Sequence, residues 1–397
     1  MLFRSGAAQS VVYYDQTNLP LFDGMQDFSA WQLVGFDGAL YCLPQYGLMG
    51  DAVHDGIERY DLQSGTWNEV ALPEAVRGKA LSVSATTWAG KLALQITDRD
   101  FAVSYWLFGA DGSWERIRAS LDPADDMPCG TLASDGNALY VFGGFSTTAG
   151  DLANIARLDM DAATLEVVGR MDASLNVGRV HPNVTYREGA FLVSGGLVAA
   201  TQAGTAQGVE RVVVGADGKA TSEAVNFSSL VTETGQLSYG VGAVKDGFML
   251  AGAASDDGKA DTYLLDNAAG TLPSAFAQRA DANPLLAPAA TAYRGAFYVM
   301  AASTVEPYRV FSATAVETVD QPGDTVIKPV DPEDPVDPVD PVDPIKPLDP
   351  PTPTAPDTPS KATALARTGD FTAPVMGLLV LVMASALATG FAVRRRR

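Results

Sequence analysis

The amino-acid sequence predicts an all-β protein: a β-propeller of six to seven four-stranded blades, followed by a disordered Pro-rich stalk and one C-terminal transmembrane helix. Short apolar runs separated by turn residues fill positions 11–319, without sustained helical periodicity. One strand-like motif recurs about every 50 residues, which in an all-β chain is typical of propeller blades. A Pro-rich segment and a long uncharged run follow the last repeat.

Asp-Gly pairs lie between many of the apolar runs and predict tight hairpin turns, because both central residues of such a turn need positive φ. The pairs are Asp37-Gly38, Asp111-Gly112, Asp135-Gly136, Asp217-Gly218 and Asp246-Gly247.

The recurring strand has a small residue, often glycine, just before it and a Leu- or Phe-centred apolar sequence. It is found at 39–43, 91–94, 138–142, 190–193, 247–250 and 296–299. These six copies predict six complete blades. A second motif follows most copies along the chain. In its first occurrence Tyr60-Asp61 is followed by Thr66-Trp67. Leu158-Asp159 leads to Thr164-Leu165 with the same gap, and we expect both to be the third and fourth strands of a blade with the turn between them.

These motifs resemble those of kelch-type β-propellers, which have a diglycine after the second strand, then Tyr-Asp and a later Trp. The diglycine is intact at Gly143-Gly144 and Gly195-Gly196, and Tyr60, Asp61 and Trp67 match the later positions. The resemblance covers roughly residues 10–320. It implies structural roles: glycine permits close approach of the inner strands, and the aromatic ring fills the gap between blades.

The N-terminal part has a half-blade over residues 10–22, where Tyr14-Asp15 leads to Leu21. It either pairs with the final strands to close the ring or is the remnant of a truncated blade. The opening residues 1–6 contain no signal peptide, which favours truncation and a start of the true chain further upstream. We therefore assign residues 1–320 to the propeller.

Residues 321–364 form a different region, with repeated Asp-Pro pairs. Proline cannot donate to a sheet ladder and biases its predecessor toward extended geometry. The sequence predicts an extended, polyproline-II-like linker that acts as a spacer. The alternative is a proline-rich ligand for a partner domain.

Residues 365–397 carry an anchor. The uncharged run 371–393 is long enough to cross a bilayer as a helix, which takes roughly 20 residues. The basic tail Arg394, Arg395, Arg396 and Arg397 follows it and is expected on the cytoplasmic side, which places the rest of the chain outside.

The five residues Leu365, Ala366, Arg367, Thr368 and Gly369 precede this run and resemble the cell-wall sorting signal of Gram-positive surface proteins. The resemblance implies that a sortase cuts between Thr368 and Gly369 and links Thr368 covalently to peptidoglycan. Ala366 replaces the usual proline, as in the Leu-Ala-x-Thr-Gly variant of high-GC actinobacteria. A plain tail anchor is the alternative. We expect a secreted, peptidoglycan-anchored protein that contacts the membrane through its helix before processing.

The formal net charge of −20 argues against nucleic acid as a partner, because phosphates would be repelled. Two cysteines, Cys42 and Cys129, could pair in an exported protein, but their positions favour two separate buried thiols.

Catalytic motifs are missing from the sequence, so we expect no enzyme, no cofactor and no metal. A copper radical site would need more histidines than His54 and His181. Acidic loops at 122–126 and 256–258 could bind calcium but are more typical of solvated turns. Arg179, His181, Arg187 and Glu188 could line the channel mouth or serve only as surface and packing residues.

The predicted function is binding or adhesion to an extracellular protein or glycan ligand. The alternative is a wall-attached carbohydrate-active enzyme or sugar isomerase that uses the central pocket of the propeller.

Overall fold

The computed structural model describes most of the region expected to form the propeller. The described residues are 16–22, 28–47, 53–118, 127–146, 148–161, 164–196, 209–215, 219–225, 240–245, 247–254, 260–266, 275–278, 285–303 and 309–319.

Six four-stranded antiparallel sheets are present in this part of the chain, together with a two-stranded sheet. In five of the four-stranded sheets the strands lie side by side in the order of the chain: β2-β3-β4-β5, β6-β7-β8-β9, β10-β11-β14-β15, β16-β17-β18-β19 and β20-β21-β22-β23. The sixth combines β24, β25 and β26 with the N-terminal strand β1. The two-stranded sheet pairs β12 (Phe145–Ser146) with β13 (Gly150–Asp151) and was not among the predicted elements.

The first strands of the sheets are β2 (Phe28–Phe36), β6 (Ala80–Trp88), β10 (Thr131–Ser134), β16 (Asn183–Arg187), β20 (Gly240–Val244) and β24 (Leu285–Tyr293). The second strands are β3 (Ala39–Gly47), β7 (Lys91–Asp98), β11 (Leu139–Phe142), β17 (Ala190–Ser194), β21 (Gly247–Ala254) and β25 (Ala296–Ser303).

The third strands are β4 (Gly56–Asp61), β8 (Val103–Phe108), β14 (Asn154–Asp161), β18 (Val209–Val214), β22 (Ala260–Asp266) and β26 (Arg309–Ala315). The fourth strands are β5 (Thr66–Ala71), β9 (Trp114–Arg116), β15 (Glu166–Ser174), β19 (Ala220–Val225), β23 (Ala275–Gln278) and β1 (Gln16–Asn18).

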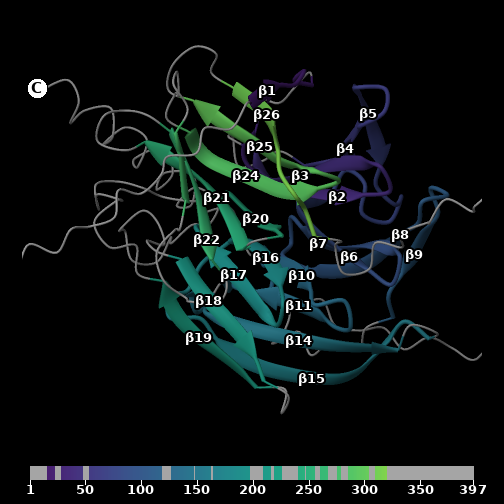
Figure 1. Ribbon diagram of the computed structural model, residues 1–397. Helices are drawn as coiled ribbons and strands as arrows, with labels where there is room; N and C mark the ends of the chain where they lie inside the picture. Colours follow the sequence, from purple (N-terminus) through teal and green to yellow (C-terminus); the bar gives the residue numbers. More distant parts are fainter. Residues whose placement is uncertain are drawn as a thin grey trace, which may run out of the picture.

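The sheets follow one another around a ring (Figure 1). Each first strand contacts the first strand of the next sheet, from β2 through β6, β10, β16 and β20 to β24, and β24 contacts β2 again. The chain thus has an all-β, propeller-like fold in which the first strands surround a common axis.

The recurring motif of the sequence is the second strand of every sheet, as predicted. Leu40, Leu92, Leu139, Phe191 and Phe248 are all fully buried. A strand between two others in its sheet, with a neighbouring sheet on each face, has no solvent side. This explains why its apolar residues run consecutively instead of alternating.

In four of the described sheets the turn between the first and second strands has positive φ at two successive residues, and Asp-Gly is only one of the sequences found there. Asp37-Gly38 has φ of 43° and 72°, as expected for the tight hairpin. The same pair of positive φ values occurs at Ala89-Gly90, Glu188-Gly189 and Arg294-Gly295. At Asp111-Gly112 and Asp135-Gly136 only the glycine has positive φ, so the expectation for those two pairs was wrong in detail.

The closing sheet brings together the two ends of the described region. In β1, residues Gln16, Thr17 and Asn18 pair with Thr314, Ala313 and Ser312 of β26. Leu19 N–H then donates to the Phe311 carbonyl at 2.8 Å. For residues 16–18 this pairing is the one expected for closure of the ring.

The aromatic residue of the fourth strand packs in the gap between neighbouring sheets. The Trp67 ring lies 4.9 Å from Phe22 and 5.3 Å from Phe311 of the closing sheet, measured between centroids. Trp114 of the second sheet lies 4.7 Å from Phe108 and packs against the core shared with the first sheet.

The turn between third and fourth strands shifts in the third sheet. In the first sheet Gly65 N–H donates to the Asp61 carbonyl, whereas in the third Leu165 N–H donates to Asp161, not to Asp159. A bulge between Asp159 and Met160 lengthens β14. The equal spacing of the two signatures therefore did not correspond to equal turns.

The cysteines are two separate buried thiols, as expected. The linker 321–364 and the segment 365–397 lie outside the described residues, and so does the expected helix 371–393. Within the described residues, no helix is long and apolar enough to span a membrane.

Candidate functional site

The axis of the ring contains a narrow cavity of about 50 Å³. All six first strands line it, with Gln32, Thr86, Ser134, Asn183 and Thr291 among the polar contributors. A single ordered water needs roughly 10–15 Å³. The cavity therefore has room for a few waters, whereas pockets for organic ligands measure roughly 300 Å³ or more.

Polar side chains link the first strands around this cavity. Gln32 Nε2 donates to the Ala85 carbonyl at 2.9 Å, and Gln32 Oε1 accepts hydrogen bonds of 2.8 Å from Ala85 N–H and from Ser84 Oγ. Ser84 Oγ in turn accepts a 2.8 Å hydrogen bond from Leu132 N–H. These contacts connect the first, second and third sheets where no ladder bonds can form.

Side-chain hydrogen bonds also connect the sheets on the other side of the ring. Thr131 Oγ1 donates to the Pro182 carbonyl at 2.6 Å, which ties the third sheet to the entry of the fourth. Asn183 Nδ2 donates to the Pro288 carbonyl at 3.2 Å and reaches the closing sheet. These side chains satisfy buried backbone groups and thereby connect neighbouring sheets at the centre of the ring.

The segment before the fourth sheet carries the most deeply buried charges among the described residues. The Arg179 side chain is fully buried and forms an ion pair with Glu210 of β18, whose side chain is 4% exposed. Arg179 Nη1 also donates to the Gly195 carbonyl at 3.0 Å. Burial lowers the pKa of Arg179, and the charge and hydrogen bond of Glu210 oppose that shift.

Glu210 collects hydrogen bonds as well as the ion pair. Its Oε2 accepts from Asn176 N–H at 2.7 Å and from Ser222 Oγ at 2.6 Å. A buried ion pair is stable only when such additional bonds satisfy its remaining atoms. The pair therefore fixes the path of residues 176–179 against β18. An acidic residue within the apolar sequence Val209–Val214 was the signal that sequence reasoning missed.

The predicted diglycines are explained by this segment. A Cβ on Gly143 would lie 2.1 Å from the Arg179 carbonyl oxygen, and one on Gly196 would lie 2.8 Å from that of Val180. Both residues of each pair, Gly143-Gly144 and Gly195-Gly196, have positive φ. Their neighbour is thus the chain entering the fourth sheet. Close approach between first strands occurs instead at Gly35, where a Cβ would meet the Tyr293 ring at 2.2 Å, and at Gly240 and Gly242.

His181 and His54 are buried in different places. The backbone N–H of His181 donates to the Cys129 carbonyl at 3.1 Å, and the backbone N–H of His54 donates to the Ala80 carbonyl at 2.9 Å. Burial lowers the pKa of His181 to about 3 and that of His54 to about 4. Neither these histidines nor Arg179 lines the central cavity, so the packing interpretation describes them better than a place at the channel mouth. Arg187 instead reaches the next sheet, where it donates to the Lys245 carbonyl.

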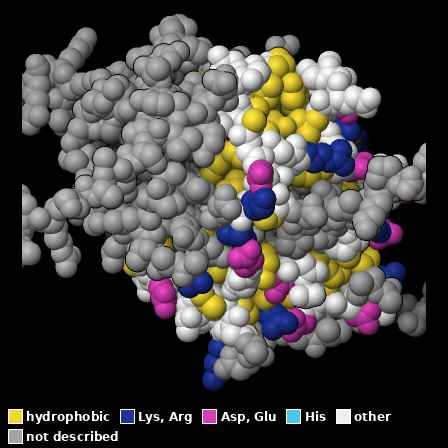
Figure 2. Space-filling model, in the orientation of Figure 1, with side chains coloured by type: hydrophobic (Ala, Val, Ile, Leu, Met, Phe, Trp, Pro, Cys, Tyr) yellow, Lys and Arg dark blue, Asp and Glu magenta, His cyan; other side chains and the backbone are white. Residues whose placement is uncertain are grey.

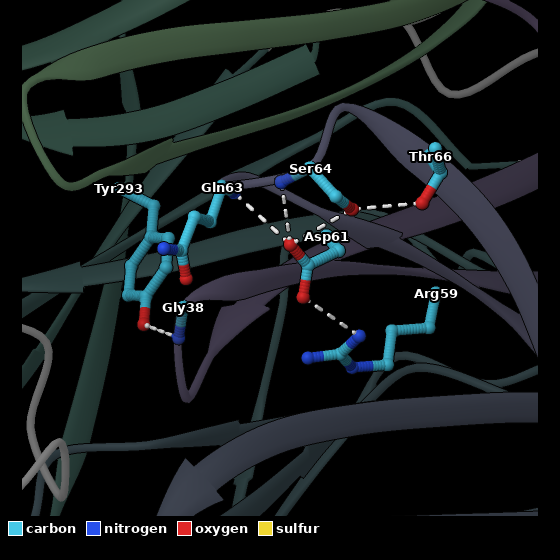
Figure 3. A network of polar contacts seen from close by, with 7 residues as sticks. All are labelled: Gly38, Arg59, Asp61, Gln63, Ser64, Thr66 and Tyr293. Carbon is cyan, nitrogen blue, oxygen red and sulfur yellow. Dashed lines mark hydrogen bonds and ion pairs between the residues drawn. The ribbon is translucent and has the colours of Figure 1, made fainter.

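Tyr60, Asp61 and Trp67 lie together at the outer part of the first sheet. Tyr60 and Trp67 are cross-strand partners with ring centroids 5.0 Å apart. Asp61 Oδ1 accepts from Gln63 N–H at 3.1 Å and Ser64 N–H at 2.8 Å, and Arg59 lies 3.1 Å from Oδ2 (Figure 3). Hydrogen bonds from Ser64 lower the pKa of Asp61, with a smaller contribution from Arg59. These contacts are those of packing and turn formation.

The remaining predicted site residues cannot be placed. Leu365, Ala366, Arg367, Thr368, Gly369 and Arg394 to Arg397 lie outside the described residues, and so do the acidic loops at 122–126 and 256–258. In the part of the chain that is described, no group of three or more His, Cys, Asp or Glu side chains could hold a metal ion. Basic and acidic side chains are interspersed over the described part of the face in Figure 2.

No family model and no curated protein matches the chain. Among solved structures, one described as the structure of YjhT aligns with a TM-score of 0.48 and 11% sequence identity. The alignment covers 75% of this chain and 95% of that one.

Proposed function

We propose that this protein is displayed on the wall of a Gram-positive cell, where its propeller-like domain binds an extracellular protein or glycan. The observation that carries the proposal is the order of three C-terminal features. The pentapeptide 365–369 is followed by the uncharged run 371–393 and then by the basic tail 394–397. Sortase, peptidoglycan and, before processing, the membrane are the partners that this order implies.

The dimensions of the axial cavity favour display over pocket chemistry. A cavity of about 50 Å³ is several times smaller than a typical pocket for an organic ligand. The polar groups around it, such as Gln32 and Ser84, are engaged with neighbouring strands. This supports a role for the outer surface and gives less support to a sugar isomerase that works on the ring axis.

Wall attachment is tested by expressing the full chain in a Gram-positive host with its own sortases, behind a secretion signal. Wall fragments released by a muralytic enzyme are then analysed by mass spectrometry. We expect a product whose C-terminal residue is Thr368, joined to a peptidoglycan peptide. Thr368→Ala should remain in the membrane fraction, while Thr372→Ala, a matched change within the uncharged run, should be processed normally.

A product that extends beyond Thr368, or a Thr368→Ala variant that still reaches the wall, contradicts the attachment. Binding is tested separately with cells that display the wild-type chain, applied to arrays of matrix proteins and glycans. Cells displaying a sorted protein without the propeller serve as the control. Equal signals from the two cell types would contradict the binding role.

A further inference from the structure

A second hollow lies away from the ring axis, at the outer edge of the first sheet. It is a groove of about 510 Å³ between strands β4 and β5 on one side and residues 20–22 on the other. Residues 20–22 follow β1, so the groove lies where the closing sheet meets the first sheet. The Trp67 indole N–H spans it by donating to the Pro20 carbonyl at 2.7 Å.

One part of the groove is apolar. Pro20, Leu21, Phe22 and Trp67 contribute to its lining, and Leu21 is 42% exposed. Only one other large apolar side chain of the described residues, Val177, is exposed to a similar degree. Leu21 is therefore one of two large apolar side chains of the described residues that offer an exposed contact surface.

The other part of the groove carries two carboxylates. Glu58 of β4 and Glu69 of β5 are direct cross-strand partners, next to the Tyr60 and Trp67 pair. Side chains two residues apart on a strand share a face, so both carboxylates lie on the same side as the Trp67 ring. A Cβ on Gly56 would meet Glu69 Cγ at 2.4 Å, so glycine at that position leaves room for the Glu69 side chain.

This arrangement of carboxylates is unfavourable in the protein alone. Like charges directly opposite each other destabilise a sheet. Burial raises the pKa of Glu58, and the charge of Glu69 raises it further. Within the described residues neither carboxylate forms an ion pair, although Lys91, Arg157 and Arg179 all pair with acidic groups elsewhere. A cation placed between Glu58 and Glu69 would relieve their repulsion.

We infer that the groove receives an arginine or lysine side chain of a protein partner. The aliphatic stem of such a side chain would pack on Leu21 and Pro20, and its charged head would lie between Glu58 and Glu69. Basic side chains bury their stems on apolar surface in this way, and the two carboxylates supply the opposite charge for the head. A metal ion would leave the apolar wall unused and would find only two ligands. The inference rests on the proposed binding role and specifies the chemistry of its ligand.

The test uses the full chain and a fluorescein-labelled tetra-arginine peptide, with binding followed by fluorescence anisotropy at pH 7. In the variant Glu58→Gln/Glu69→Gln we expect the Kd to rise about ten-fold, which corresponds to about 1.4 kcal/mol. Leu21→Ser should raise it about three-fold while leaving the charges in place.

The matched control is Glu115→Gln/Glu223→Gln, which removes the same number of charges from the outer strands β9 and β19. Because the whole domain is acidic, this control measures non-specific attraction, and we expect less than a two-fold change. A groove variant that binds like the control overturns the inference. A melting curve for each variant shows whether it is folded, and the single variants Glu58→Gln and Glu69→Gln serve if the double variant is not.

The two proposals fail in different ways. Cells that display the wild-type protein are compared with cells that display the Glu58→Gln/Glu69→Gln variant. If both bind an array protein equally well, the groove is not the site and the binding role stands. If the purified chain binds the tetra-arginine peptide through the groove but the cells bind nothing on the arrays, the groove stands and the binding role does not.

Discussion

The Tyr293 phenolic oxygen accepts a 3.0 Å hydrogen bond from the Gly38 backbone N–H, between residues 255 positions apart in the chain (Figure 3). Tyr293 ends the first strand of the closing sheet, and Gly38 lies in the first hairpin of the first sheet. The same ring covers Gly35, where a Cβ would lie 2.2 Å from its Cγ. A comparable contact links two other sheets, where the Trp88 indole N–H donates to the Asn137 carbonyl at 3.3 Å.

The contact between Gly35 and Tyr293 predicts a specific pattern of stability. Gly35→Ala should lower the free energy of unfolding by about 2 kcal/mol or more, because the methyl group has no room beside the ring. Tyr293→Phe should cost about 1 kcal/mol through the lost hydrogen bond. In the double variant Gly35→Ala/Tyr293→Ala the effects of the single variants Gly35→Ala and Tyr293→Ala should not add, because the smaller side chain leaves room for the methyl group. Urea denaturation provides the measurement, and additive effects would contradict the close approach.

The diglycine at Gly143 should be far less tolerant than a turn glycine. Gly143→Ala introduces both a positive-φ strain and a contact of 2.1 Å with the Arg179 carbonyl oxygen. Gly112→Ala introduces only the strain, since nothing lies within 4 Å of its Cβ position. We expect a loss of about 1 kcal/mol for Gly112→Ala and at least twice that for Gly143→Ala, measured by thermal unfolding. Equal losses would show that backbone conformation alone selects glycine at position 143.

The buried pair Arg179 and Glu210 should be more costly to break than to replace. Arg179→Met leaves the Glu210 carboxylate buried without its partner, and such changes cost about 3–5 kcal/mol. The double variant Arg179→Met/Glu210→Leu removes both charges and should recover a large part of that loss. Arg157→Met is the control, because its ion pair with Asp159 is partly exposed. Denaturant midpoints distinguish the cases, and a double variant less stable than Arg179→Met would contradict this account.

The two buried histidines should make the domain sensitive to mild acid. Their pKa values of about 3 and 4 in the folded protein lie below the ordinary value of 6.5. Between these limits the unfolded chain binds more protons than the folded one. Stability is therefore fully present above pH 6.5 and falls as the pH drops toward 4, by up to about 1.4 kcal/mol per pH unit for each histidine.

Replacement of His181 by Gln tests this dependence. The variant should show a shallower loss of stability between pH 6.5 and 4 than the wild-type protein, even if it is less stable at pH 7. Denaturation by urea at a series of pH values provides the slopes. Parallel slopes for the two proteins would mean that His181 does not contribute to the acid sensitivity.

The second strands could be recognised from the sequence because burial on both faces leaves a continuous apolar run, as at Leu139–Phe142. The turns were less predictable, because positive φ at two residues can be met by Glu188-Gly189 as well as by Asp37-Gly38. The shift of the turn to Asp161 arises from a bulge, which no spacing rule reveals.

The contacts around the ring axis were beyond the reach of sequence reasoning for a different reason. Gln32, Ser84 and Leu132 come from three separate sheets, and their hydrogen bonds exist only once the sheets are assembled. The groove is a similar case, because Glu58 and Glu69 share a hairpin but Leu21 joins them through closure of the ring. Glu58 and Glu69 taken alone look like ordinary polar positions of outer strands.

The position of β26 has a mechanical consequence. This strand lies between β25 and β1 in the closing sheet. The residues after β26 are bonded to the fifth sheet, where Thr318 forms a bridge with Val244 and Lys245 N–H donates to the Glu317 carbonyl. A force applied to the chain beyond these residues would load this bridge first and β26 next. Hydrogen bonds between antiparallel strands lie perpendicular to the strands, so the bonds on both sides of β26 are loaded together in shear and not opened one at a time. A sheet closed in this way resists a pull at this end until several of its hydrogen bonds break together.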